Sequence, residues 1–162
     1  MSNPNVTQGK GRPGLKSGRS NEFTLILPLK PGGADRLRKK LGPDQFRDQN
    51  RSFADRVGTL HDMRFLIFDN DTRLLFASTF DGDWDVYIND FGSIIPDQID
   101  MIFGEAEGFP GIHDPNVKDW IVKNQVPATY FYSAYPNTSV RDVWKGSKIK
   151  GGLDVVLDAV TS

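Results

Sequence analysis

The chain has 162 residues, a length at which one domain with its own hydrophobic core is the simplest organisation. Its 20 lysines and arginines balance 21 acidic residues, and the formal net charge of -1 gives no overall field that would attract nucleic acid or a membrane. Cysteine is absent, which excludes disulfides, thiolate nucleophiles and cysteine-ligated zinc or iron–sulfur sites.

The first part of the chain predicts a tail followed by one strand and two helices. Residues 1–21 are glycine-rich and basic and contain no acid, so they bury too little apolar surface to offset their ordering entropy. We therefore predict a disordered tail over 1–21 and a single domain over 22–162. Apolar residues alternate through Asn21–Leu29, which predicts a strand. Narrow apolar stripes predict helices over Ala34–Leu41 and Asp44–Val57.

A β-hairpin is predicted next, from two runs rich in β-branched, aromatic and aliphatic residues, Leu60–Phe68 and Arg73–Phe80. A two-residue loop at Asn70-Asp71 pairs Phe68 with Arg73 and defines two sheet faces. The apolar face, which we expect under helices, carries His61, Met63, Phe65, Ile67, Leu74, Phe76, Ser78 and Phe80. The second face, which suits a half-enclosed cavity, carries Asp62, Arg64, Leu66, Phe68, Arg73, Leu75, Ala77 and Thr79.

After the hairpin, Asp83 is positioned as the N-cap of a helix whose apolar residues recur every three to four positions. Pro96 interrupts this pattern and predicts a kink or a restart. Further on, Asp114-Pro115 predicts the beginning of another short helix.

The C-terminal third is predicted to contain one strand and two short helices. Ala128–Tyr135 is aromatic and alternating, which is typical of a strand. Ser139 and Asp142 form a capping pair for a short turn of helix, and Leu153–Val160 predicts a final short helix. The resulting order is β–α–β–β–α–β, an α+β ferredoxin-like arrangement with an antiparallel sheet and helices on one face.

Three segments, GTLHDMRFLIF, RLLFASTF and FDGDWDVYINDF, together resemble an uncharacterised family of ferredoxin-like proteins in the dimeric α/β-barrel superfamily. Relatives in that superfamily include dye-decolourising peroxidases, chlorite dismutase-like proteins and small monooxygenases. The resemblance implies a homodimer whose sheets pack together, with a cavity between sheet and helices that binds a small apolar molecule or haem. The Gly-x-x-Asp-Gly signature of the dye-decolourising peroxidases is absent, so no catalytic residue is carried over.

The candidate catalytic residues are His61 and Arg64. As haem ligand or general base, His61 needs a partner for its second nitrogen, and Asp81 or Asp83 are placed to supply it. Arg64 suits binding of a carboxylate or of a peroxide-like oxygen, and the alternative for it is an ion pair at an interface. The expected ligand-binding positions are Asp62, Thr79, Asp81, Trp84, Tyr130 and Tyr132.

These features leave two functional hypotheses. The first is a homodimer whose cavity binds a small apolar ligand or haem, with peroxidase-like oxidoreductase chemistry. The second is a non-catalytic interaction or accessory scaffold, which the lack of a His, Cys or paired-acid cluster favours. No apolar run approaches the roughly 18 residues of a membrane span, and no signal-peptide core is present. We therefore expect a cytoplasmic protein without a metal, nucleic-acid or membrane partner.

Overall fold

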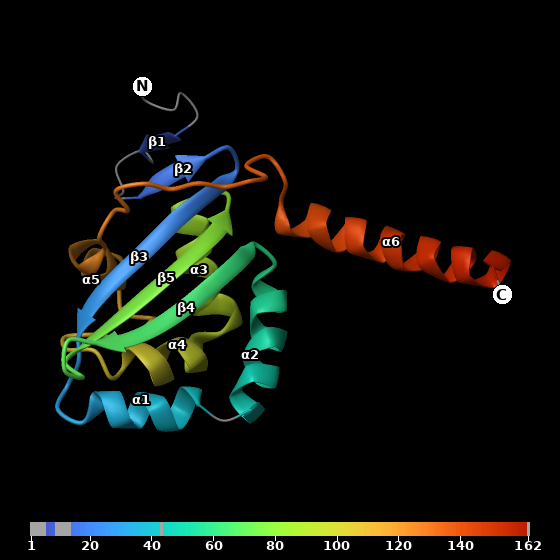
Figure 1. Cartoon of the computed structure of the whole chain (residues 1–162). Coiled ribbons are helices and arrows are strands. Elements are labelled where there is room, and N and C mark those ends of the chain that lie inside the picture. Colours follow the sequence, from blue (N-terminus) through green and yellow to red (C-terminus); the bar gives the residue numbers. More distant parts are fainter. Residues whose placement is uncertain (1–5, 9–13, 43, 162) are drawn as a thin grey trace.

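The computed structural model describes residues 6–8, 14–42 and 44–161. In these ranges the chain forms one antiparallel sheet with the spatial strand order β1-β2-β3-β5-β4 (Figure 1). Its strands are β1 (Val6–Gln8), β2 (Leu15–Ser17), β3 (Ser20–Pro28), β4 (Leu60–Phe68) and β5 (Arg73–Asp81). The helices are α1 (Gly33–Leu41), α2 (Asp44–Val57), α3 (Trp84–Ile94), α4 (Pro96–Phe103), α5 (Val117–Asn124) and α6 (Val140–Thr161).

The predicted hairpin is confirmed from Asp62 onward. Phe68 pairs with Arg73, and the Thr72 N–H donates to the Asp69 carbonyl over 3.1 Å, which closes the two-residue loop. Asn70 and Asp71 both adopt positive φ (52° and 66°), the geometry of the tight hairpin turn that matches the twist of paired strands. Local turn chemistry therefore sets the register of the central strands.

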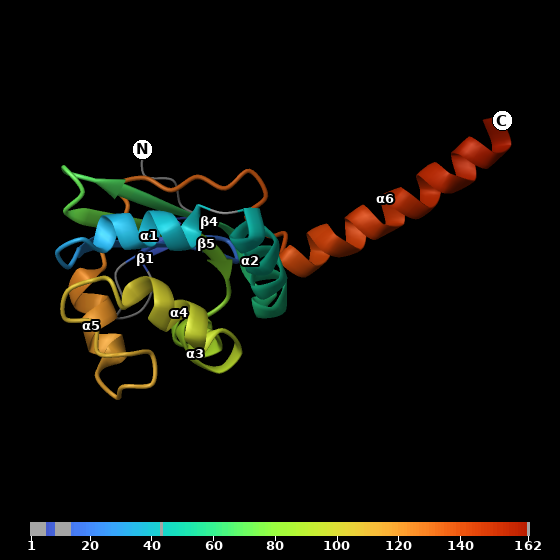
Figure 2. The same cartoon turned by 90° about the horizontal axis from the view of Figure 1, so that it is seen from below.

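The apolar face of the hairpin packs under helices, as predicted. Phe76 is only 2% exposed and its ring meets Phe103 of α4 edge to face, with 5.5 Å between ring centroids. Phe80 stacks on Tyr87 of α3 at 4.0 Å. Figure 2 shows α3 and α4 below one face of the sheet, while, of the described segments, an extended one before α6 crosses the opposite face. As predicted, Asp83 is the N-cap of α3, and the helical pattern restarts at Pro96, where α4 begins.

His61 departs from its predicted position. Leu60 pairs with Phe80 and Asp62 with Thr79, so the register shifts between Leu60 and Asp62, and His61 is the extra residue of a β-bulge. Strict alternation assigned His61 to the apolar face opposite Phe80, and that assignment is wrong. A bulge redirects the side chain of the extra residue, and here it turns His61 toward the end of β5.

The predicted strand over Ala128–Tyr135 does not form, and the reason lies in the predicted tail. Gln125 makes a single antiparallel bridge with Leu25 of β3, and the chain then leaves the sheet. In that register Thr129 and Tyr130 would pair with Asn21 and Ser20, but Lys16 and Ser17 of β2 already occupy those positions. Residues 14–21, which we predicted as tail, thus belong to the sheet, whereas residues 1–5 and 9–13 lie outside the described part.

The Glu22 side chain connects the two segments that meet at this edge of β3. Its side chain is buried, and Oε1 accepts hydrogen bonds from the backbone N–H groups of Leu15 (3.1 Å) and Ala128 (2.9 Å). Oε2 accepts a third bond from the Thr24 hydroxyl at 3.2 Å. One carboxylate therefore satisfies backbone donors from two segments that are distant in sequence.

The α+β class with an antiparallel sheet is confirmed, while the finer ferredoxin-like order lacks its last strand.

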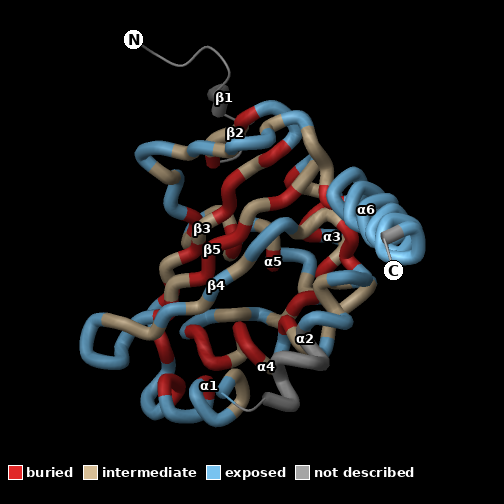
Figure 3. The backbone as a smooth tube through the Cα atoms, turned by 45° about the vertical axis from the view of Figure 1, so that its right-hand side comes forward, coloured by how far each residue is buried: buried red, intermediate tan, exposed pale blue. Residues whose placement is uncertain are grey.

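The last two helices differ from their predicted bounds. Asp114 accepts a hydrogen bond from the Asn116 N–H (2.8 Å), which makes a turn, and α5 begins only at Val117. The two predicted C-terminal helices are one continuous helix, α6, because the glycines inside it weaken the helix without ending it. α6 projects away from the sheet and is exposed along its length (Figures 1 and 3). No described helix is both long and apolar enough for a bilayer crossing.

Candidate functional site

The bulge in β4 brings His61 and Asp81 together at one end of the sheet. The His61 Nε2 atom lies 2.8 Å from Asp81 Oδ1, and the two side chains keep only 22% and 12% of their exposed area. The other Asp81 oxygen, Oδ2, accepts a hydrogen bond from the Val140 N–H at 2.8 Å. The contact between His61 and Asp81 that we predicted is present, and Asp81 also anchors the first turn of α6.

The beginning of α6 is fixed by the predicted capping pair. The Ser139 hydroxyl donates to Asp142 Oδ2 over 2.6 Å, and the Asp142 N–H donates back to the Ser139 oxygen over 3.2 Å. The hydrogen bonds from Ser139 and, more weakly, the charge of Arg19 lower the pKa of Asp142 below its usual range. Asp142 is therefore ionised at neutral pH and complements the positive end of the α6 dipole.

Two pockets flank the His61–Asp81 pair. The smaller one, about 240 Å³, is lined by His61, Met63 and Trp144, by further apolar residues of α2, β4 and α6, and by two carboxylates, Asp55 and Asp62. The larger one, about 380 Å³, lies on the Asp81 side and is lined by cationic side chains and by glycines from three turns. Both pockets are open to solvent and share the first turn of α6 as a wall.

The chemistry available at the pair is that of one oriented imidazole. Asp81 holds Nε2 and leaves Nδ1 as the second ring nitrogen, an arrangement that suits a histidine used as a proton acceptor or as a ligand. Acid–base catalysis requires a further group positioned on the same substrate. Among the described residues there is no group of three or more His, Asp or Glu side chains suited to a metal ion.

The second candidate catalytic residue, Arg64, lies elsewhere. It is exposed on the open face of the sheet, and its Nη1 atom is 3.9 Å from Asp62 Oδ1 on the same strand. Thr79 is half-buried opposite Asp62. Trp84 is buried in the core, where its ring packs against Phe23 at 6.4 Å. Asp62 lines the smaller pocket together with His61, whereas the structure does not bring Arg64, Thr79 or Trp84 to the His61–Asp81 pair.

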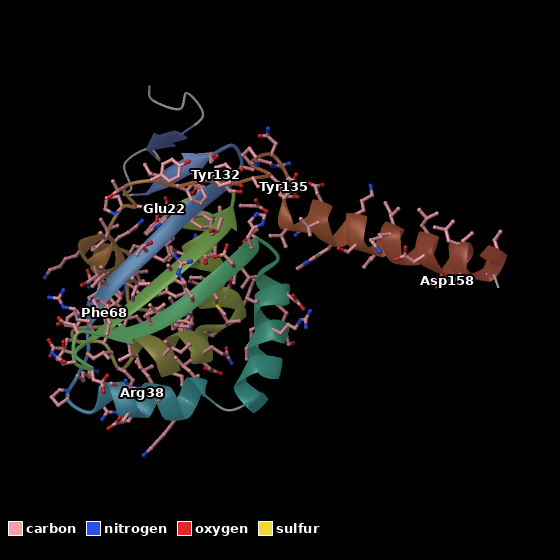
Figure 4. The ribbon with its side chains drawn as sticks, in the orientation of Figure 1. Glu22, Arg38, Phe68, Tyr132, Tyr135 and Asp158 are labelled. Atoms are coloured by element: carbon pink, nitrogen blue, oxygen red, sulfur yellow. The ribbon has the colours of Figure 1, made fainter. Side chains whose placement is uncertain are left out.

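The tyrosines expected to line a cavity lie on the open face. Tyr130 and Tyr132 belong to the extended segment between α5 and α6 and are largely exposed, as is Tyr135. Figure 4 shows Tyr132 and Tyr135 on this segment where it passes β2 and β3. The face that we expected to be half enclosed thus carries an aromatic segment in contact with solvent.

Sequence reasoning missed the residues that α6 and β2 contribute to the pockets. Trp144 and Arg141 enter through the first turns of α6, and Lys16 enters from β2, which we assigned to the tail. The capping pair Ser139–Asp142 was the available signal that a helix begins here. Nothing local indicated that this helix begins against Asp81, which is 59 residues earlier in the chain.

The comparisons with known proteins leave the family open. Family models, curated protein sequences and solved structures were compared with the chain, and none matches it. The resemblance to the dimeric α/β-barrel superfamily therefore stays a prediction. Function has to be inferred from the geometry of this chain.

Proposed function

We propose that this protein is a non-catalytic scaffold that forms a homodimer by pairing its α6 helices. The observation that carries the proposal is a stripe of exposed apolar side chains along α6. Its members are 55 to 80% exposed and lie four, three and four residues apart, the a/d spacing of a coiled-coil seam; they are Ile149, Leu153, Val156 and Val160. We call these four residues the α6 stripe.

The composition of α6 supports a requirement for a partner. The helix contains Gly146, Gly151 and Gly152, each of which costs about 1 kcal/mol relative to alanine in a helix interior. Isolated helices are marginal in water even without glycines, and most helices in proteins are stabilised by packing one apolar face. Burial of the α6 stripe against another helix supplies that stabilisation.

Charge complementarity favours a second copy of the chain, in antiparallel orientation. The first half of α6 carries Lys145, Lys148 and Lys150, and the second half carries Asp154 and Asp158. Lys150 and Asp154 already pair within the helix over 2.6 Å. In an antiparallel pair the basic half of each helix lies alongside the acidic half of the other, with Asp154 and Asp158 on the side of α6 away from the α6 stripe, and the helix dipoles oppose.

The seam of this pair follows from the spacing. Two copies that run antiparallel place Ile149 against the partner's Val160, and Leu153 against the partner's Val156. Asp158 lies near the free end of α6 in Figure 4, far from the sheet, so neither domain obstructs the other. A helix of 22 residues is about 33 Å long, which leaves room for all four layers of the seam.

Sedimentation equilibrium of the full chain tests the dimer. Wild-type protein should be dimeric at micromolar concentration, and Leu153→Asp should raise the dimer dissociation constant by at least about tenfold, because it places a charge in the seam. Val155→Asp is the matched control, since Val155 is also exposed (69%, against 55% for Leu153) but lies outside the α6 stripe. A monomeric wild type, or equal loss in both variants, contradicts the proposal.

Orientation is tested by disulfide cross-linking, because the chain has no cysteine of its own. In the antiparallel seam position 149 of one copy lies against position 160 of the other, so an equimolar mixture of Ile149→Cys and Val160→Cys should form the mixed disulfide on oxidation. Neither variant alone should cross-link. In a parallel pair each variant would link to its own copy instead, and that result contradicts the antiparallel arrangement.

The ferredoxin-like relationship belongs to this proposal. It is supported by the antiparallel order β3-β5-β4 and by helical connections between β3 and β4 and after β5. It is also supported by the Leu25–Gln125 bridge, which lies on the edge of β3 where the fourth strand of that fold would pair. In this chain that strand is reduced to the bridge, and dimerisation through α6 takes the place of packing between sheets.

Binding of a small apolar molecule beside His61 is a second candidate function. The smaller pocket combines His61 with Met63 and Trp144, and Asp81 orients the imidazole. Haem does not fit here, since the pocket of about 240 Å³ lies below the usual 300–1,000 Å³ of ligand sites, is open to solvent, and has Asp55 and Asp62 in its lining. A smaller apolar ligand is therefore the form of this function that the residues allow.

The haem form is tested by absorption spectroscopy. We expect that haemin added to the full chain gives no saturable Soret band that depends on His61, when wild type and His61→Ala are compared. A band present in the wild type and lost in the variant would show that His61 ligates haem iron, and it would overturn our conclusion about the fit.

A further inference from the structure

The larger pocket beside Asp81 has the composition of an anion site. It has a volume of about 380 Å³ and lies at the end of the sheet where β2, β5 and α6 meet. Three cationic side chains line it, and each comes from a different element: Lys16 from β2, Arg19 from the turn before β3, and Arg141 from α6. Residues distant in the sequence thus converge on one concave surface.

The positive charge in this pocket is not neutralised by salt bridges. None of the ion pairs formed within the described part of the chain includes Lys16, Arg19 or Arg141. The one carboxylate in the lining, Asp81, is engaged by His61 and by the Val140 N–H. Asp142 interacts electrostatically with Arg19, but its oxygen is held by Ser139.

The walls between the cations carry few side chains. Gly18, Gly58 and Gly82 all line the pocket and all adopt positive φ (61°, 70° and 90°), so glycine is favoured at each position. Thr59 lies in the same wall, and its buried hydroxyl has no hydrogen-bond partner among the described residues. Such walls admit a polar ligand close to the backbone.

We propose that this pocket binds a small molecule bearing phosphate groups. Arginine presents a planar fork of N–H donors that matches phosphate oxygens, and lysine adds a point charge. Two arginines and a lysine around one cavity suit at least two negative charges, and the volume lies within the usual range for small-molecule sites. The site is separate from the α6 stripe and does not depend on dimerisation.

Isothermal titration of the full chain with inorganic pyrophosphate tests the site. Sodium chloride of matched ionic strength in the reference titration controls for screening. Wild-type protein should bind pyrophosphate saturably, and Arg19→Ala/Arg141→Ala should weaken binding by at least about tenfold, because two charge-assisted contacts are lost. Both side chains are exposed, so the double variant should keep the circular dichroism spectrum of the wild type.

The matched control is Lys39→Ala/Lys123→Ala, which removes the same charge from exposed positions on α1 and α5. Binding to the control within twofold of the wild type, together with the loss in the arginine variant, supports the pocket. Absence of saturable binding to the wild type overturns the proposal. Equal weakening in both double variants also overturns it, because the affinity would then reflect net charge alone.

Discussion

Phe76→Ala should lower the free energy of unfolding by about 3–5 kcal/mol, the usual cost of deleting a buried aromatic ring. Phe76 lies at the centre of the helix-covered face, where it meets Phe65 at 5.0 Å, Phe103 at 5.5 Å and Phe23 at 5.8 Å. These partners come from two other strands and from α4, so the cavity left by alanine is enclosed on several sides and relaxes poorly.

Urea unfolding followed by circular dichroism measures this effect, at one fixed protein concentration because self-association adds to stability. Leu66→Ala is the control, since Leu66 lies on the open face of β4 and is half exposed. Its cost should stay within about 1 kcal/mol. Similar losses for the two variants would mean that both faces of the hairpin are covered, which contradicts the arrangement of the layers.

Glu22→Ala should destabilise the protein by about 2–4 kcal/mol. The Glu22 carboxylate accepts from the N–H groups of Leu15 and Ala128, which are partly buried. A buried donor left without a partner costs about 1–3 kcal/mol, and partial access to water places these two donors toward the lower end of that range. The loss should be local at first, because the two donors lie in β2 and in the segment after α5. Hydrogen exchange at these two amides should become faster before the central strands are affected.

Glu22→Gln separates the role of the acceptor from that of the charge. Glutamine keeps one side-chain oxygen that can accept both N–H groups, and its amide can donate to the Thr24 hydroxyl. We expect a loss of roughly 1 kcal/mol or less for this variant. A loss as large as that of Glu22→Ala would mean that the negative charge, and not the pattern of acceptors, stabilises this edge.

The candidate site was only partly predictable from the sequence. The sequence predicts Asp81 or Asp83 as the partner of His61, because the hairpin brings the start of one strand near the end of the next, and in the structure the partner is Asp81. The bulge at His61, which turns its side chain toward Asp81 and away from Arg64, was not predictable, because strict alternation along β4 does not reveal it. The pockets themselves depend on α6, whose approach to Asp81 has no local signature.

The sequence alone determined the elements whose cause is local. The turn at Asn70-Asp71, the Asp83 cap, the restart at Pro96 and the Ser139–Asp142 capping pair each depend on side chains within a few residues, and each is present. The alternation along β3 likewise required no knowledge of the rest of the chain. At these positions the local conformational propensity and the tertiary packing favour the same conformation, so the sequence pattern predicts the structure.

Tertiary structure decided where two segments competed for one partner. Ala128–Tyr135 has the composition of a strand, yet β2 already pairs with Asn21 and Ser20, the residues of β3 along which this strand would continue, and the aromatic segment is left on the open face. A strand is stabilised by its neighbours, so strand propensity cannot say which of two segments pairs. Residues 14–21 pair at that edge because Gly18 permits the tight turn between β2 and β3. The buried Glu22 carboxylate then accepts hydrogen bonds from the N–H groups of both segments, at Leu15 and at Ala128.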